Sequence, residues 1–240
     1  MARISFKTVR ARAAKRKGGE AALAKLLLKP TPARALLKLT DDRALAEITR
    51  RVFCAGFVWR VIEAKWPGFE KAFLGFAPKR LLFQPDDFWE ALTRDPGIVR
   101  NPRNIRAVRD NAKFVTDIAR EHGSFGRFVA TWPVDDQVGL LELLAKRGAR
   151  LGGMTGQYLL RFLGRDGYVL SRDVVLCLRD AGVAIAAQPT SKKDLRAAQD
   201  QMNAWAAESG LPLAQVSRIC ALSVGENHPV AALLERGMDA

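Results

Sequence analysis

Apolar residues recur at three- and four-residue steps through most of this chain, and this spacing limits the fold more than any other feature. The clearest stretch carries arginines on its other face, and its apolar positions are Ile105, Val108, Ala112, Val115 and Ala119. Ser191 precedes a second helical pattern as an N-cap, and Gly210 follows it as a stop signal. No segment sustains the alternation that a half-buried strand requires. The sequence therefore predicts an all-α fold.

The charge balance predicts the kind of partner. Lysine and arginine number 39 against 25 acidic residues, which gives a net charge of +14 over 240 residues. A surplus of this size indicates polyanionic partners, with nucleic acid as the first candidate and an anionic membrane surface as the second. No window approaches the ~18 consecutive apolar residues of a spanning helix, so no membrane insertion is expected.

The cysteines and histidines are too few and too scattered for a metal centre. Cys54, Cys177 and Cys220 each lie inside an apolar helical pattern, as small buried residues do in a reducing compartment. With His122 and His228 as the only histidines, no set of four zinc ligands or four cluster cysteines has workable spacing. We expect a cytoplasmic protein without metal or cofactor, and without an obligate protein partner.

The first eighteen residues form a separate basic segment. Its cations precede the first acid, Glu20, and are Arg3, Lys7, Arg10, Arg12, Lys15, Arg16 and Lys17. A mitochondrial-type presequence, a flexible DNA-gripping arm and a solvated tail are all compatible with this composition. We favour a partly disordered arm at residues 1–18, followed by one helical domain over residues 19–240.

A glycine-dense turn separates two helical patterns and is a candidate anion site. Glycines let the backbone approach a phosphate, and the amides of the following helix favour the anion. The candidate DNA-binding residues of this turn are Gly152, Gly153, Met154, Thr155, Gly156 and Gln157. A packed corner between two helices is the alternative interpretation. Lys146, Arg147 and Arg150 lead into the turn and should add phosphate affinity.

A lone carboxylate, Asp173, stands about twenty residues beyond the turn, at the start of the next apolar helix. The dipole of a helix N-terminus keeps an aspartate ionised, which suits it to stabilise developing positive charge. Aspartate is also a preferred N-cap residue, so a purely structural role stays open.

Three motifs, in this order along the chain, resemble the DNA-3-methyladenine glycosylase I family of the helix–hairpin–helix superfamily. They are Ala55-Gly56-Phe57-Val58-Trp59, then Phe69-Glu70-Lys71-Ala72-Phe73, then the run from Asp95-Pro96-Gly97 through Arg100-Asn101 to Asn111-Ala112. The resemblance covers roughly residues 40 to 180, and the third motif is long enough to be specific. It implies a bilobal helical body with a DNA-binding cleft and the hairpin at about 151–157.

The resemblance implies that a damaged base is flipped out of duplex DNA and released by hydrolysis of its N-glycosidic bond. Trp59 matches the tryptophan that stacks on the base, although its spacing also suits ordinary core packing. Phe53, Trp132 and Tyr158 are further pocket candidates. Arg100, Asn101, Arg103 and Asn104 crowd the start of one helix and are candidate phosphate ligands.

This chain departs from the family at several positions. The glutamate that contacts methylated adenine is replaced by Arg51, which cannot accept a proton from an exocyclic amine. Arg51 suits a carbonyl oxygen or a phosphate, and a surface or ion-pair role is the alternative. Glu47 lies one helical turn earlier. The first forty residues contain none of the cysteines and histidines that bind the family's zinc. No lysine follows the hairpin until Lys192, so no Schiff-base chemistry is expected.

The sequence thus predicts a monofunctional DNA glycosylase acting on damaged, alkylated duplex DNA. Water is the nucleophile, Asp173 the catalytic acid, and Trp59 and Arg51 belong to the base pocket. A non-catalytic protein that binds DNA or lesions on the same scaffold is the alternative.

Overall fold

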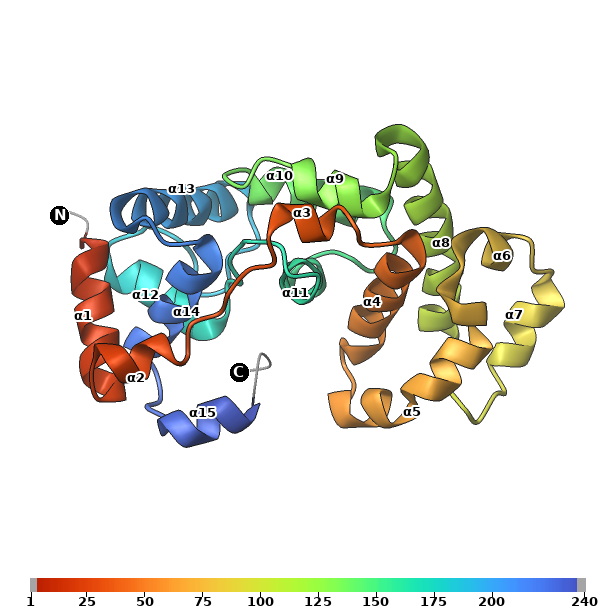
Figure 1. Ribbon diagram of the computed structural model, residues 1–240, viewed down its shortest axis with the longest axis horizontal. Helices are drawn as coiled ribbons and strands as arrows, with labels where there is room; N and C mark the ends of the chain where they lie inside the picture. The colour runs from red at the N-terminus through yellow and green to blue at the C-terminus, as the bar shows by residue number, and fades with distance from the viewer. Residues whose placement is uncertain (1–3, 237–240) are drawn as a thin grey trace. The chain divides into compact units, whose positions relative to one another are not determined.

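The computed structural model describes residues 4–236, and all regular structure within them is helical (Figure 1). The predicted all-α class is therefore confirmed. The chain divides into two compact units, each with its own hydrophobic core. Unit 1 comprises the residues up to 30, 133–138 and those from 166 onward, and unit 2 comprises residues 31–132 and 139–165. This division differs from the single domain expected over residues 19–240.

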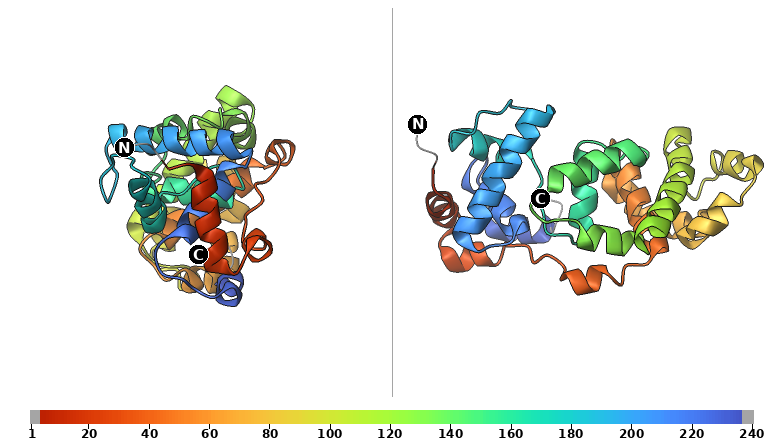
Figure 2. Two further views of the ribbon diagram at one scale, coloured as in Figure 1. Left: turned by 90° about the vertical axis from the view of Figure 1, so that its left-hand side faces the viewer. Right: turned by 90° about the horizontal axis from the view of Figure 1, so that it is seen from above.

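Unit 2 is built around one long amphipathic helix, α8, whose apolar face lies in the core and whose arginines face outward. Helices α4 and α6 pack against α8 in the views of Figures 1 and 2. The elements of this unit are α3 (Ala33–Leu36), α4 (Asp41–Cys54), α5 (Trp59–Ala72), η1 (Leu74–Phe76), α6 (Pro78–Leu82), α7 (Asp86–Leu92), α8 (Pro102–His122), α9 (Phe125–Thr131), α10 (Gln137–Arg147, from residue 139) and α11 (Met154–Phe162).

Unit 1 joins the two ends of the described chain in one core. Helix α14 packs against both α1 and α12 and is buried on most sides. The elements of this unit are α1 (Phe6–Lys17), α2 (Glu20–Ala24), α12 (Arg172–Asp180), α13 (Lys192–Ser209), α14 (Leu213–Ser223) and α15 (Val230–Arg236). The caps predicted for α13 are confirmed, because Ser191 Oγ accepts from the Asp194 amide and Gly210 ends the helix.

The basic N-terminal segment, apart from residues 1–3 outside the described part, is a packed helix and not a disordered arm. Phe6, Val9 and Ala13 of α1 are at most 1% exposed. Arg16 donates to the carbonyls of Leu222, Val224 and Gly225 at 2.7–3.1 Å, and so satisfies the open C-terminal end of α14. The apolar spacing of α1 was present in the sequence, but the density of cations concealed it.

Among residues 4–236, no helix combines the length and the apolar content that crossing a lipid bilayer requires.

We expect Phe6→Ala to lower the free energy of unfolding by about 3–5 kcal/mol, because it removes a buried ring that packs on Trp205 with centroids 5.9 Å apart. Chemical denaturation followed by circular dichroism measures the effect. Lys7→Gln, a change at the exposed neighbouring position, is the control and should shift the transition little. Equal transitions for both variants and the wild type would mean that α1 is a detached arm.

Candidate functional site

The predicted glycine turn joins α10 to α11 in unit 2. Gly153 has a φ of +59° and stands as N-cap of α11, where it offers no side chain to the first amides of the helix. Gly152, Gly153 and Met154 are exposed. The helix therefore begins at an exposed end without a capping side chain, an arrangement that attracts anions.

The other half of the turn is packed. A Cβ added at Gly156 would lie 2.5 Å from the carbonyl oxygen of Leu151, so only glycine fits there. Gln157 is 6% exposed, and Thr155 is half-buried. Of the six residues predicted to bind DNA in this turn, the structure thus leaves Gly152, Gly153 and Met154 on the surface.

One buried side chain holds the turn against α8. Asn111 Nδ2 donates to the Ala149 carbonyl at 3.0 Å, and Asn111 Oδ1 accepts from the Ala149 amide at 2.8 Å. Asn111 is 1% exposed, and its two bonds to the half-buried Ala149 satisfy both ends of its side-chain amide. The asparagine of the third sequence motif therefore positions the residues that lead into the hairpin.

The four residues predicted to bind DNA at the start of α8 have different surroundings. Asn101 Oδ1 accepts from the amides of Arg103 and Asn104 at 3.1 and 3.2 Å, so Asn101 is the N-cap. Asn104 is 1% exposed and donates toward the Val52 carbonyl at 3.4 Å, which places it in the core. Arg100 and Arg103 are exposed and available to a ligand.

Arg51, the residue at the family glutamate position, is engaged with its own helix and with α11. Its Nε lies 2.8 Å from Glu47 Oε1, and its guanidinium lies 3.7 Å from the ring centroid of Phe162. Its side chain is 11% exposed and that of Glu47 19%. Burial raises the pKa of the Glu47 carboxyl, while Arg51 and Arg50 act in the opposite direction. The positive charge of Arg51 is thus largely neutralised.

A hollow of about 270 Å³ lies beside this ion pair and is lined by Glu47, Phe162 and Trp66, among others. A second cation–π contact lies beside the hollow, where the Arg50 guanidinium is 4.0 Å from the ring centroid of Trp66. Guanidinium groups thus lie over the rings of both Trp66 and Phe162 at this hollow. The four-residue step from Glu47 to Arg51 was the available sequence signal. Phe162 lay beyond the motifs and was missed.

The aromatic residues predicted for the base pocket lie in different surroundings. Trp59 begins α5 and is 47% exposed, with Phe57 and Val58 exposed before it. Phe53 is fully buried against Phe69, with ring centroids 4.8 Å apart, and is a core residue. Trp132 is half-buried and packs edge-on to Phe128, and Tyr158 is half-buried on α11. Trp59 is therefore the predicted residue with a free aromatic surface.

Asp173 lies in unit 1, in the first turn of α12. The N-cap of α12 is Ser171, whose Oγ accepts from the Val174 amide at 3.4 Å, so capping is not the role of Asp173. The half-buried carboxylate lies against Gly225, because a Cβ built there would come within 2.5 Å of Asp173 Oδ1.

The side chains present do not fit the zinc site that the family resemblance implies. Within residues 4–236, no three His, Cys, Asp or Glu side chains are grouped to hold a metal ion. Burial raises the pKa of the Cys54 and Cys220 thiols, which disfavours the thiolate that zinc binds.

A family model supports the resemblance over part of the chain. The family model described as methyladenine glycosylase matches residues 37–141. A crystal structure of 3-methyladenine DNA glycosylase I is similar at 22% identity and a TM-score of 0.46, over 52% of this chain and 80% of that chain. The 3-methyladenine DNA glycosylase I of Staphylococcus aureus is similar at 19% identity and a TM-score of 0.48, over 69% of this chain and 88% of that chain.

We expect Gly156→Ala to destabilise the protein by about 1–3 kcal/mol, because its methyl group meets the rigid Leu151 carbonyl. Gly152→Ala is the matched control, since its nearest neighbour would be Ala145 Cβ at 3.7 Å. Thermal unfolding of the two variants measures the difference. A Gly156→Ala variant as stable as Gly152→Ala would contradict the close contact between residue 156 and the Leu151 carbonyl.

The Glu70 carboxylate gives a pH-dependent prediction. Hydrogen bonds from Arg43 at 2.8 and 3.1 Å, and one from Trp66, lower the pKa of Glu70. A lowered pKa stabilises the fold above the unfolded-state value of ~4.3, and this contribution is lost as the pH falls through the folded-state value. Glu70→Gln should therefore cost about 1 kcal/mol at pH 7 and nothing in strong acid. Urea titrations across pH measure this, with the exposed Glu90→Gln as control. A cost independent of pH would exclude the ionic contribution.

Proposed function

The chain resembles the methyladenine glycosylase family over residues 37–141, and from this premise we propose that it is a monofunctional DNA glycosylase. It flips an alkylated base out of damaged duplex DNA and hydrolyses the N-glycosidic bond. One observation carries the proposal. The helix of the long family motif holds Ala149 through Asn111, next to the exposed and uncapped glycine turn, and this contact supports a DNA-binding role for the turn.

The reaction needs a nucleophile and charge stabilisation. Water adds to C1′ of the sugar, the base departs with the bonding electrons and a proton, and positive charge develops on the sugar in between. A fixed carboxylate lowers the energy of that charge. We assign this role to Asp173, because it is half-buried at a helix start and is not needed as the N-cap. The chain has no lysine between Lys146 and Lys192, which supports hydrolysis without strand cleavage.

A non-catalytic DNA-binding protein is the second candidate function. The Glu47–Arg51 pair favours it, because a guanidinium occupies the face of Phe162 where a planar base would otherwise stack. Such a protein would retain the hairpin and its salt-sensitive affinity without releasing a base.

Base release from alkylated duplex DNA tests the proposal. We expect the wild type to release a methylated purine, and Asp173→Asn to slow release by about 10²–10³-fold at equal DNA occupancy, because the charge-stabilising group is removed. Chromatography of the freed bases measures the rates. Asp135→Asn, at an exposed aspartate of the same unit, is the control and should match the wild type.

The other outcomes are also decisive. Release that Asp173→Asn leaves unchanged would keep the glycosylase and exclude Asp173 as its catalytic acid. Tight DNA binding with no release from alkylated duplexes would assign the protein to the non-catalytic class.

A further inference from the structure

Three arginines beside the hairpin border one hollow of about 280 Å³. Arg103 and Arg106 come from the first turns of α8, and Arg150 comes from the turn before α11. All three are exposed, and none of their guanidinium groups has an ion-pair partner among residues 4–236. Nearby arginines differ in this respect, since Arg109 binds Asp86 and Arg147 binds Glu121, each at 2.7 Å.

The position of Arg150 is fixed by the fold and is strained. Asn111 holds the neighbouring Ala149 against α8, which brings Arg150 to the two α8 arginines. Arg150 has a φ of +62°, a conformation that glycine adopts more easily. With Asp110 as the one acid lining this hollow, the four side chains carry a net charge of +2. This geometry suits a doubly liganded anion such as a phosphodiester.

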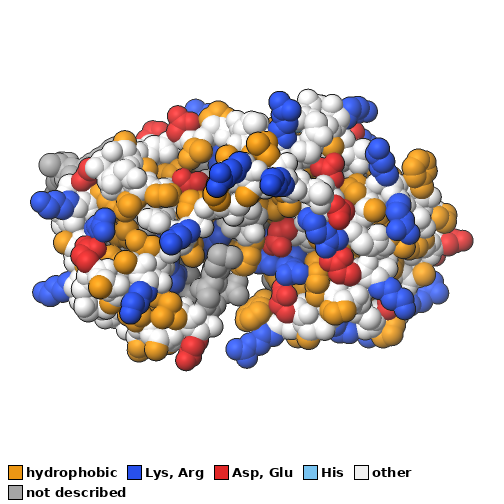
Figure 3. Space-filling model, viewed as in Figure 1, with side chains coloured by type: hydrophobic (Ala, Val, Ile, Leu, Met, Phe, Trp, Pro, Cys, Tyr) orange, Lys and Arg blue, Asp and Glu red, His pale blue; other side chains and the backbone are white. Residues whose placement is uncertain are grey.

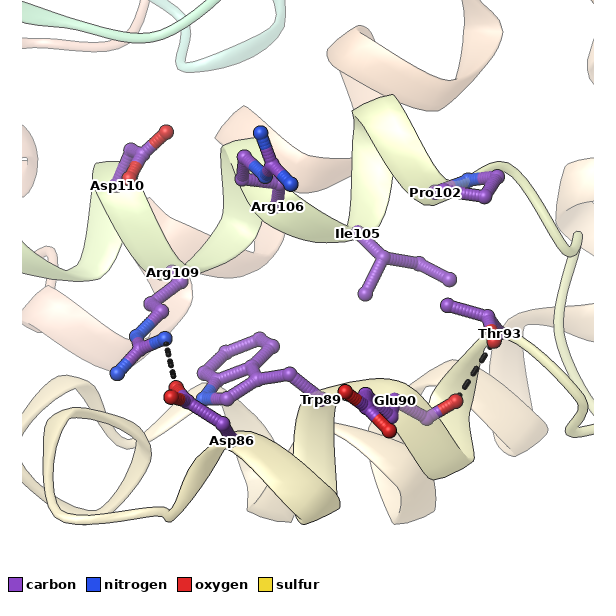
Figure 4. A pocket seen from close by; sticks show the side chains of 9 residues that line it. All are labelled: Asp86, Trp89, Glu90, Thr93, Pro102, Ile105, Arg106, Arg109 and Asp110. Carbon is purple, nitrogen blue, oxygen red and sulfur yellow. Dashed lines mark hydrogen bonds and ion pairs between the residues drawn. The ribbon is translucent and has the colours of Figure 1, made fainter.

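A larger hollow of about 560 Å³ continues from the first, and Pro102, Arg106 and Asp110 line both. Figure 4 shows Ile105 of α8 and Trp89 of α7 pointing into the space between the two helices. Trp89 is 7% exposed, and its Nε1 is buried with no hydrogen-bond partner in the described structure. The Thr93 hydroxyl donates to the Glu90 carbonyl at 2.7 Å. This N–H is therefore a donor that an acceptor entering the groove can satisfy.

We propose that these two hollows together bind one nucleotide of a DNA strand outside the hairpin. Arg103, Arg106 and Arg150 hold its phosphodiester. Its unpaired base enters the groove between α7 and α8 and displaces the side chains that cover Ile105 (2% exposed) and Trp89 Nε1, so that it packs on Ile105 and accepts a hydrogen bond from this N–H. The choice of DNA as the source of the phosphate rests on the proposed function, but base release is not required for this binding.

Salt-dependent binding of oligonucleotides tests the phosphate site. Fluorescence anisotropy would follow a labelled thymine strand of about 12 nucleotides with Arg103→Gln, Arg106→Gln and Arg150→Gly. The triple variant should reduce the slope of log affinity against log salt by about 0.7, as expected when one phosphate contact to a single strand is lost, and each single variant should reduce it by part of that amount. Arg80→Gln, at an exposed arginine of α6, removes the same charge and should leave the slope unchanged. Equal effects of all four changes would overturn the site and leave only non-specific attraction.

The base groove needs a comparison of two ligands. A strand of abasic tetrahydrofuran units has the same phosphates as the thymine strand but no carbonyl acceptors. Trp89→Phe keeps a ring and removes the N–H, so it should weaken thymine-strand binding about fivefold and abasic-strand binding not at all. Equal weakening of both strands would overturn the groove as a base site, because a folding defect affects both ligands.

Two further measurements distinguish a failure of this strand site from a failure of the proposed glycosylase function. In the first, inorganic phosphate competes with the strand for the wild-type protein. If it does so while the arginine variants keep the wild-type slope of log affinity against log salt, the hollow binds a free anion and the strand site is overturned. Base release from alkylated duplex is measured in parallel with the same variants. If the arginine variants lower the salt dependence of binding and the wild type releases no base, the strand site is supported and the glycosylase is refuted. If the wild type releases a base and the salt dependence is the same in all variants, the glycosylase is supported and the strand site is refuted.

Discussion

The surface that we assign to DNA depends on two hydrogen bonds between the Asn111 amide and the backbone of Ala149. The Asn111 side chain is buried, so the loss of either bond would leave one of its polar groups without a partner. The two bonds fix the register between α8 and the turn before α11. The uncapped start of α11 and the side chain of Arg150 are placed by that register, while the packed Gly156 allows α10 to lie close behind. A change at residue 111 therefore acts on the DNA surface without touching DNA.

The proposed recognition of a base involves a different interaction, the ion pair between Arg51 and Glu47. An arginine at the family glutamate position would repel a cationic alkylpurine if its charge were free. Glu47 compensates that charge at 2.8 Å, and the same burial that raises the pKa of Glu47 strengthens the attraction. The carboxylate has in effect moved one helical turn along α4 and now lines a hollow with Trp66 and Phe162. Whether a base or a guanidinium occupies the Phe162 face is the physical difference between the enzyme and the non-catalytic binder.

The helical class, the caps of α13 and the extent of α8 followed from the sequence, because local spacing and capping determine them. Tertiary partners determined what the sequence did not reveal. Phe53 and Asn104 have residue types that suit a pocket or a phosphate, but both are buried in the core of unit 2. The same limit applies to α1, where Phe6 and Val9 find their partners about 200 residues later along the chain. Spacing reveals a face of a helix, but not what covers it.

The net charge of +14 overstates the surface available to DNA, because many cations serve the fold. Arg43, Arg50 and Arg147 are held by carboxylates, while Arg16 and Lys17 bind carbonyl oxygens at the end of unit 1. On the face shown in Figure 3, blue lysine and arginine side chains stand apart from one another, with red acidic ones between several of them.

Paired charges contribute little to counterion release on binding, since their partners already neutralise them. The cations that matter for a strand are the unpaired ones that converge, and in unit 2 Arg103, Arg106 and Arg150 meet both conditions beside the hairpin. Strand affinity should therefore follow the position of each arginine more closely than the total charge.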